Sequence, residues 1–371
     1  MRRQLWFFAV ISLLAACATD APTGSGAATS PPAIGPWTAS RGPDLPMATA
    51  NNAVAVALVD GEPRIFSFLG LGVGRDYAAI TRRAFVLDVA AARWEPLPDV
   101  PGPVGRLAAT AQAIGSRVFL FGGYSVAADG KETTSPATDI YFVGERRYVR
   151  GADAPVPLDD TVSGVWRDRL IYLVSGWSTD RTVTTVQAYD PKADRWLAAT
   201  PIPGTPVFGH AGGLIDDTIV YCGGAKMLGG GTPKYGPSHE CYRGDIDATD
   251  PTIIEWRTIA THPGPPRYRA AAGAVRTATH AGILFVGGTS NPYNYNGTGY
   301  DGRPAEPEPS SWLYDTARDT WVAGPTLDEP SMDHRGLVEA GDAWWIVGGF
   351  GGGQAVSAHV TRLTVGESGK D

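Results

Sequence analysis

The segment LIYLVSGWSTDRTVTTVQAYDPKADRWLAATPIP, residues 170–203, contains in about thirty residues the unit that the rest of the chain repeats with variations. Its apolar, branched start at residues 170–174 predicts a strand, and Ser175-Gly176 is expected to end that strand with a bend. Residues 182–189, rich in Thr and Val, predict a second strand. An Asp-Pro turn then leads to a third strand at residues 195–197. Because such a meander cannot bury both faces alone, it needs neighbours of the same kind.

A hydrophobic strand that ends in a Gly pair, or a near-pair, recurs about every fifty to sixty residues. The six strands end at Gly70, Gly123, Gly176, Gly224, Gly288 and Gly349. Each is followed by a variable loop, a strand with an aromatic residue, a turn and usually a Trp. The aromatic pairs are Phe85 with Trp94, Tyr141 with Tyr148, Tyr189 with Trp196, Tyr242 with Trp256, and Tyr314 with Trp321. The pattern predicts an all-β chain of six repeated units.

The sixth unit has no fourth strand of its own, because the chain ends soon after residues 360–363. Trp37, at the other end, begins what looks like the missing Trp strand. With its Gly pairs, spaced Tyr and Trp, and the YDPxxxxW turn at residues 189–196, the chain resembles the Kelch-repeat β-propellers over residues 37–365. The resemblance implies an all-β, six-bladed propeller whose last blade is closed by the N-terminal strand, which removes an exposed sheet edge. The alternative, a two-sheet sandwich, predicts no fixed period.

The N-terminus has the pattern of an export signal, with Arg2-Arg3 before an apolar run and small residues before Cys17. Residues 1–17 resemble a bacterial lipoprotein signal, which implies that Cys17 becomes the lipidated first residue of the mature chain. An ordinary secretory peptide cleaved near Ala16 or Ala18 is the alternative. Ala18 after the cysteine favours the periplasmic face of the outer membrane. Residues 18–36 are predicted to be a flexible tether, and residues 366–371 a C-terminal tail.

Charge and cysteine usage restrict the partners. The formal charge of −7 becomes about −9 once Arg2 and Arg3 are removed, which argues against nucleic acid or anionic lipid. Contact with the membrane is expected only through the lipid, and the protein is expected to be a monomer.

Cys222 and Cys241 lie in two successive predicted strands and are predicted to form a disulfide, with two buried thiols as the alternative. No cofactor or metal site is expected, since there is no CxxC and there are few histidines.

In a propeller, the loops after the Gly pairs and those between blades meet at one mouth, where function is expected. Each predicted blade begins with a polar segment, at residues 49–52, 104–106, 158–160, 208–210, 267–269 and 333–335. Arg106 and His210 are explained equally well as structural residues and as ligand contacts. Arg267, Arg269 and Arg335 lie in segments that hold more charge than structure needs, so we predict that they contact a ligand.

The longest loop, residues 289–311, interleaves tyrosines with polar residues. Its candidate ligand contacts are Tyr293, Asn294, Tyr295, Tyr300 and Asp301. Aromatic rings that stack on sugar faces, beside amides that bond hydroxyls, favour a neutral carbohydrate-type ligand, although a loop packed on its own blade is the alternative. The loop at residues 225–240 adds Tyr235 as a further contact. The loop at residues 177–181 is short and is predicted to be plain scaffold.

Gly223-Gly224-Ala225-Lys226, with the Asn/Tyr/Gly loop after residue 288, is similar to the periplasmic sialate mutarotases, also called N-acetylneuraminate epimerases. The resemblance implies opening and closing of a sugar ring, which needs a general acid and base. The family has a glutamate where this chain has Gly224, so only Lys226 matches. A base would come from His239, Glu240, Asp301 or His334, and a sialic acid carboxylate would pair with Arg269 or Arg335.

We therefore expect a sugar or glycan-type ligand at a mouth walled by blades four to six. The alternative is a non-catalytic scaffold or interaction module of the outer membrane that binds a periplasmic protein.

Overall fold

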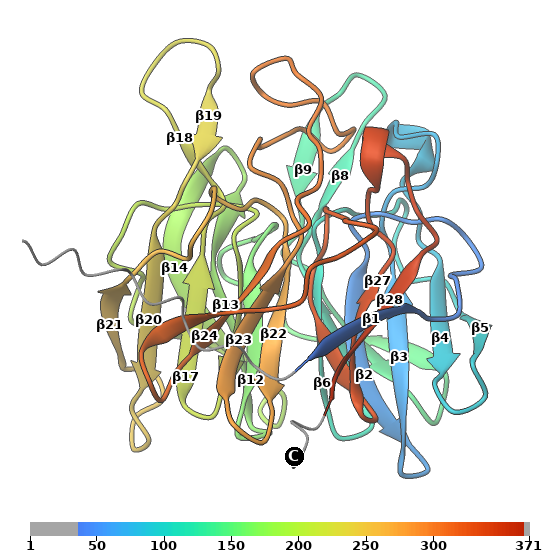
Figure 1. The fold of residues 1–371 in the computed structure, drawn as a ribbon. Coiled ribbons are helices and arrows are strands. Elements are labelled where there is room, and N and C mark those ends of the chain that lie inside the picture. Colours follow the sequence, from blue (N-terminus) through green and yellow to red (C-terminus); the bar gives the residue numbers. More distant parts are fainter. Residues whose placement is uncertain (1–35, 367–371) are drawn as a thin grey trace, which may run out of the picture. The chain divides into compact units, whose positions relative to one another are not determined.

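The computed structural model describes residues 36–366. They form six four-stranded antiparallel sheets set around a central axis, together with two small two-stranded sheets (Figure 1). The first strands of the six blades contact one another in a closed circle, in the order β2, β6, β12, β16, β22 and β26. No helix in the described segment is long and apolar enough to cross a membrane. The predicted signal with Cys17, the tether up to residue 35 and the tail from residue 367 lie outside the described residues.

The blades follow one another along the chain. Blade one consists of β2 (Ala53–Val59), β3 (Glu62–Phe68), β4 (Ala84–Asp88) and β5 (Arg93–Leu97). Blade two consists of β6 (Thr110–Ile114), β7 (Arg117–Phe121), β10 (Thr138–Phe142) and β11 (Arg147–Arg150). Blade three consists of β12 (Val162–Trp166), β13 (Leu170–Ser178), β14 (Arg181–Asp190) and β15 (Arg195–Ala199). Blade four consists of β16 (Ala211–Ile215), β17 (Thr218–Cys222), β20 (Cys241–Ile246) and β21 (Ile254–Ile259). Blade five consists of β22 (Ala271–Arg276), β23 (Ala281–Val286), β24 (Ser311–Asp315) and β25 (Thr320–Ala323). Blade six consists of β26 (Val338–Ala340), β27 (Ala343–Val347), β28 (Val360–Val365) and β1 (Trp37–Arg41).

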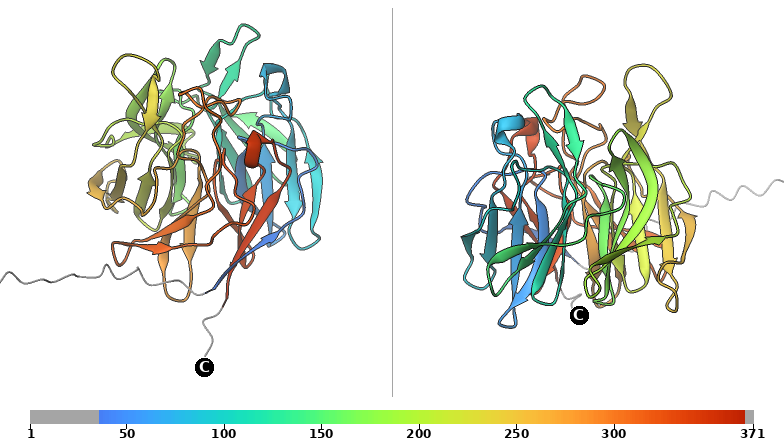
Figure 2. Two further views of the ribbon diagram at one scale, coloured as in Figure 1. Left: turned by 45° about the horizontal axis from the view of Figure 1, so that its top comes forward. Right: turned by 180° about the vertical axis from the view of Figure 1, so that it is seen from behind.

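Two hairpins rise from the same end of the propeller (Figure 2). They are β8–β9 (Tyr124–Val126 and Glu132–Thr134), inserted in the second blade, and β18–β19 (Ala225–Met227 and Tyr235–Pro237), inserted in the fourth. Two single 3-10 turns, η1 (Tyr77–Ala79) and η2 (Gly352–Gln354), complete the described elements. We call the end of the propeller from which the two hairpins rise the loop face.

The sixth blade is completed by the first strand of the described chain. β1 pairs antiparallel with β28, from Trp37 opposite Val365 to Arg41 opposite Thr361. β28 pairs on its other side with β27. The predicted closure is therefore confirmed, and the backbone groups of β28 are bonded on both edges.

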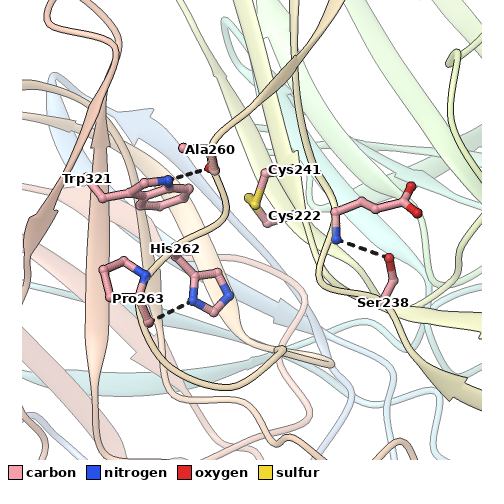
Figure 3. The surroundings of a disulfide bond; sticks show 8 residues. Cys222, Ser238, Cys241, Ala260, His262, Pro263 and Trp321 are labelled. Atoms are coloured by element: carbon pink, nitrogen blue, oxygen red, sulfur yellow. Dashed lines mark hydrogen bonds between the residues drawn. A yellow bond between two sulfur atoms is a disulfide. The ribbon is translucent and has the colours of Figure 1, made fainter. Parts of the chain in front are cut away.

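In the first five blades, the spaced aromatic residues join each blade to the preceding one. Trp321 donates its indole N–H to the carbonyl of Ala260, at 2.7 Å, in the segment that leaves the fourth blade (Figure 3). Equivalent bonds are made by Trp94, Trp196 and Trp256. In the second blade, Tyr148 stands in place of Trp, and its hydroxyl donates to the carbonyl of Pro98 at 3.0 Å. The substitution thus preserves the contact between blades.

One detail differs from the sequence expectations. β13 does not end at Ser175-Gly176 but continues to Ser178, with a shift of register between Val174 and Gly176, so the bend is an irregularity within one strand. Trp94 lies opposite Leu87 rather than Phe85. Likewise, Trp256 lies opposite Gly244 rather than Tyr242. A shift of two residues leaves the aromatic side chain on the same face of the sheet, because side chains alternate along a strand.

Cys222 and Cys241 lie directly opposite each other on β17 and β20 and form the predicted disulfide (Figure 3). The β18–β19 hairpin is the excursion between these two strands. The disulfide therefore closes the base of that hairpin.

Candidate functional site

A pocket of about 160 Å³ opens on the loop face, and we call it the mouth pocket. It is lined by Tyr124, Glu132, Asp159, Asp160, Trp177, Phe208, Tyr235, Arg269, Asn294 and Tyr300. These residues come from the second to fifth blades, including both inserted hairpins. The pocket thus depends on the parts of the chain in which one blade differs from another.

Beneath it, six residues, one at the start of each blade, form a hydrogen-bonded circle that we call the hub ring. Asn51, Ala108, Asp160, Gly209, Arg269 and Asp333 each have a positive φ, between 50° and 71°. Five of their backbone N–H groups donate to the carbonyl of the ring residue in the preceding blade, at 2.7–3.1 Å. The sixth, that of Ala108, donates to the side-chain oxygen of Asn51. A left-handed backbone at a non-glycine residue costs on the order of 1–3 kcal/mol, which the surrounding bonds must offset.

Side chains of the hub ring form a buried ion network. Arg269 donates to both carboxylate oxygens of Asp160, at 3.1 and 2.6 Å, and to Asp333 at 2.9 Å. Arg335 lies 2.5 Å from Asp160, and all four side chains are at most 3% exposed. Burial acts to raise the pKa of Asp160, but Arg269 and Arg335 outweigh it and lower that pKa below its usual value. Asp160 is therefore held as a carboxylate.

Asp159 departs from the repeat. The residue before each hub residue is apolar in the other five blades, namely Ala50, Leu107, Phe208, Tyr268 and Met332. Asp159 is 2% exposed, and its carboxyl accepts a hydrogen bond from the Thr134 hydroxyl at 2.8 Å. Burial, followed by the charge of Asp160, raises the pKa of Asp159 well above its usual value. Two adjacent carboxyls thus have pKa values displaced in opposite directions, which is typical of acid–base sites.

Four aromatic side chains form one wall of the mouth pocket. The ring centroids of Trp177 and Phe208 are 5.5 Å apart, and those of Trp177 and Tyr235 are 5.7 Å apart. The ring of Tyr235 lies 4.6 Å from that of Tyr300. All three contacts are edge-to-face, so neighbouring rings stand at steep angles to one another. We call these four residues the aromatic wall.

Comparisons with known proteins agree with this architecture. Over 270 residues, the chain is 24% identical to Kelch domain-containing protein 3 of Bos taurus, which covers 65% of this chain and 63% of that protein. Over 107 residues, it is 31% identical to Kelch-like protein 15 of Gallus gallus, which covers 29% of this chain and 22% of that protein. The chain thus spans less than two thirds of the length of these relatives. No protein-family model matches the sequence.

The solved structure of YjhT is similar to this one with a TM-score of 0.70 at 16% sequence identity, over 89% of this chain and 98% of that chain. The fold is that of a Kelch-type β-propeller. At this level of identity, the likeness concerns the fold alone, so the chemistry of the site has to be argued from its residues.

Four of the predicted contacts meet in the mouth pocket of the Kelch propeller: Tyr235, Arg269, Asn294 and Tyr300. The sequence predicts a mouth walled by blades four to six, whereas the pocket is lined by blades two to five. The difference arises because the β8–β9 hairpin brings Glu132 to the pocket and places Thr134 beside Asp159.

Three predicted residues line the central channel of the Kelch propeller instead, a cavity of about 280 Å³ between the inner strands: His210, His334 and Arg335. The ring of His210 bonds the Val174 carbonyl at 2.9 Å, and that of His334 bonds the Ser331 hydroxyl at 2.9 Å. Burial lowers the pKa of His210 to about 4 and, together with Arg335, that of His334 to about 3. Both rings are therefore neutral at pH 7.

Other predicted contacts serve the architecture of the Kelch propeller. Arg106 pairs with Asp139 at 2.6 Å, and Arg267 donates to the Ser310 hydroxyl at 2.6 Å. Tyr293 is fully buried, with the Arg269 guanidinium carbon 5.3 Å from its ring centroid. Tyr295 packs against the apolar cluster below the loops. None of the four lines the mouth pocket.

The remaining candidate acids and bases are dispersed. Lys226 lies on β18, and the His239 ring lies 4.9 Å from that of His262. Figure 3 shows His262 near the disulfide. Glu240 accepts a hydrogen bond from the Tyr242 hydroxyl at 2.8 Å. Asp301 accepts one from the Asn291 amide at 3.0 Å and another from the Arg303 backbone. The structure therefore does not bring these residues together at the mouth pocket.

Sequence reasoning did not single out Asp159, Glu132 or Trp177. Trp177 lies in the loop that was predicted to be plain scaffold, yet it lines the pocket. One signal in the sequence could have found Asp159, because aligning the blade starts shows a lone acid among five apolar residues. The position of Glu132 depends on an inserted hairpin, which the repeat pattern does not predict.

Proposed function

We propose that this Kelch propeller binds one small, sugar-like ligand in the mouth pocket. The aromatic wall, beside the Asn294 amide and the pocket carboxyls, carries this proposal. Aromatic rings can stack on the faces of a sugar, while amides and carboxyls bond its hydroxyls. The volume of about 160 Å³ is below the ~300–1,000 Å³ of drug-sized sites, which favours a single ring.

The charge of this ligand is proposed to differ from that of sialic acid. Arg269 and Arg335 are paired with Asp160 and Asp333, so two guanidiniums and two carboxylates balance one another. A ligand carboxylate would have to compete with these buried pairs, whose disruption is unfavourable. We therefore favour a ligand without negative charge.

The location is part of the proposal. The signal-like residues 1–17 favour a lipoprotein anchored through Cys17, with residues 18–36 as its tether. The propeller would then present its mouth pocket in the periplasm, at the outer membrane, as a monomer.

Thermal unfolding of the purified full-length protein with a panel of neutral and amino sugars tests ligand binding. Trp177→Ala and Tyr300→Ala should each weaken binding about tenfold, because each removes one stacking face. Tyr77→Ala is the matched control, since Tyr77 is 47% exposed in η1 and does not line the pocket. A melting temperature that no sugar raises would contradict the proposal and favour the alternative of a protein-binding scaffold.

A second candidate function, mutarotation, is favoured by the raised pKa of Asp159. The carboxyl of Asp159, whose pKa is raised by burial, would give its proton to the ring oxygen of the sugar as the bond from that oxygen to the anomeric carbon breaks. Glu132, at the rim, would accept the proton of the anomeric hydroxyl, leaving an open-chain carbonyl. NMR exchange between anomers should be faster with the protein than without it and slower with Asp159→Asn. Equal exchange rates with and without wild-type protein would exclude this activity.

A further inference from the structure

The mouth pocket contains more acidic side chains than its one basic side chain can pair with. Its charged residues are Glu132, Asp159, Asp160 and Arg269. Arg269 is engaged by Asp160 and by Asp333 beneath it. The ion network of the hub ring, with Arg335, is balanced without the other two acids. Asp159 and Glu132 are therefore two acidic side chains that this network does not pair, and they lie on the pocket side of the hub ring.

Asp159 is the more unusual of these two acids. It is 2% exposed, and within residues 36–366 the Thr134 hydroxyl is its hydrogen-bond partner, while no basic side chain lies within ion-pair distance. A buried carboxyl without a cation is unfavourable, and the other five blades have an apolar residue at this position. The fold therefore does not need an acid there.

Glu132 faces the same space. It lies two residues before Thr134 on β9, and side chains two apart in a strand project from one face. Since the Thr134 hydroxyl bonds Asp159, this face of β9 turns toward Asp159. Glu132 is exposed at the rim of the pocket, so a ligand can meet it on entering.

The aromatic wall completes the arrangement. Trp177, Phe208, Tyr235 and Tyr300 line the same cavity as the two acids. The face of an aromatic ring attracts a cation, and cages of several rings recognise ammonium groups. A neutral ligand would use the rings but leave Asp159 without an ionic partner.

We propose that the ligand of the mouth pocket carries an ammonium group, a protonated or quaternary amine, which contacts the aromatic wall and pairs with Asp159 and Glu132. This inference rests on the proposed function of the pocket and adds the charge of the ligand, so an amino sugar is the favoured class. The carboxylate form of Asp159 makes the ion pair, so the bound cation opposes the rise in the pKa of Asp159 that burial causes.

Calorimetric titration of the full-length protein with matched probes tests the inference. Glucosamine, glucose and N-acetylglucosamine share one ring but differ in charge, and tetramethylammonium supplies the charge without the ring. At pH 6.5, where an amine is protonated, glucosamine should bind at least about tenfold more tightly than glucose. Tetramethylammonium should compete with it.

Variants at the two acids refine this test. Asp159→Asn and Glu132→Gln should each weaken glucosamine binding about tenfold or more and change glucose binding by less than about twofold. Glu132→Gln alters an exposed side chain, so the test does not depend on Asp159→Asn folding. Glu145→Gln is the matched control, because it removes one exposed carboxylate that does not line the pocket.

The outcomes separate the two proposals. Glucose binding as tightly as glucosamine would overturn the ammonium inference and leave the sugar pocket supported. Tetramethylammonium binding without any sugar would support the ammonium site and contradict the sugar. If none of the four probes binds, both proposals are wrong.

Discussion

The mouth pocket and the central channel adjoin the same hub ring, but they are built differently. All six inner strands contribute to the channel, and its two histidines are buried and neutral at pH 7. The mouth pocket is lined by four of the six blades and contains the aromatic wall together with Asp159 and Glu132, two acids without a basic partner. The repeat thus produces a uniform interior, whereas insertions and one altered repeat position produce the pocket. Changing each part separately should show that stability depends on the ring and ligand binding on the mouth pocket.

The largest effect is expected from Arg269→Ala. This change leaves Asp160 and Asp333 buried without their shared cation, and removing one partner of a buried ion pair costs about 3–5 kcal/mol. The free energy of unfolding, measured with urea, should fall by that amount. Arg303→Ala, at a side chain that is 85% exposed, is the control and should be nearly neutral. A loss below about 1 kcal/mol for Arg269→Ala would show that the ion network does not stabilise the ring.

A smaller loss of stability is expected when the disulfide is removed. Cys222 and Cys241 are 19 residues apart, so replacing both with Ala should lower the free energy of unfolding by about 3 kcal/mol. The hairpin that carries Tyr235 should also become more mobile, since its base is no longer fixed. Urea unfolding measures the first effect, and hydrogen exchange at residues 225–237 measures the second. Unchanged exchange in this hairpin, with the rest of the blade intact, would argue against the second effect.

The smallest effect concerns pH and Asp159, which faces Asp160, Glu132 and Arg269. Its pKa in the folded protein is raised above the value near 4 of an unfolded chain, so the folded state holds the proton more tightly. Stability should therefore fall as the pH rises from about 4 through the raised pKa. Asp159→Asn lacks this fall, so its stability relative to wild type should increase with pH. Urea midpoints measured from pH 4 to 8 test this, with Glu145→Gln as the control; parallel curves would contradict it.

The fold was predictable because each blade repeats the same physical requirements. The Gly pairs after the second strand adopt positive φ, as at Gly223 and Gly224, where a Cβ atom would meet backbone. The segment that begins at Trp37 resembles the last strand of a repeat whose other strands are missing at that end of the chain. This predicted that β1 completes the sixth blade. Disulfide pairing followed from the alignment of two strands within one blade.

The site was less predictable, because it depends on contacts between blades. Tyr235, Arg269, Asn294 and Tyr300 could be chosen by residue type and loop position. Arg106 and Arg267 have the same chemistry but pair within the scaffold, which their sequence does not reveal. Trp177 belongs to the most regular repeat and gains its role only because loops of other blades adjoin it.

The pairing of β1 with β28 also constrains the order of events during synthesis. Trp37 is made long before its partner Val365, so the sixth sheet cannot be completed until synthesis has passed residue 365. During synthesis, β1 therefore has no partner strand while the first five blades form. A product that stops before residue 360 lacks β28 and therefore leaves β1 without its partner strand.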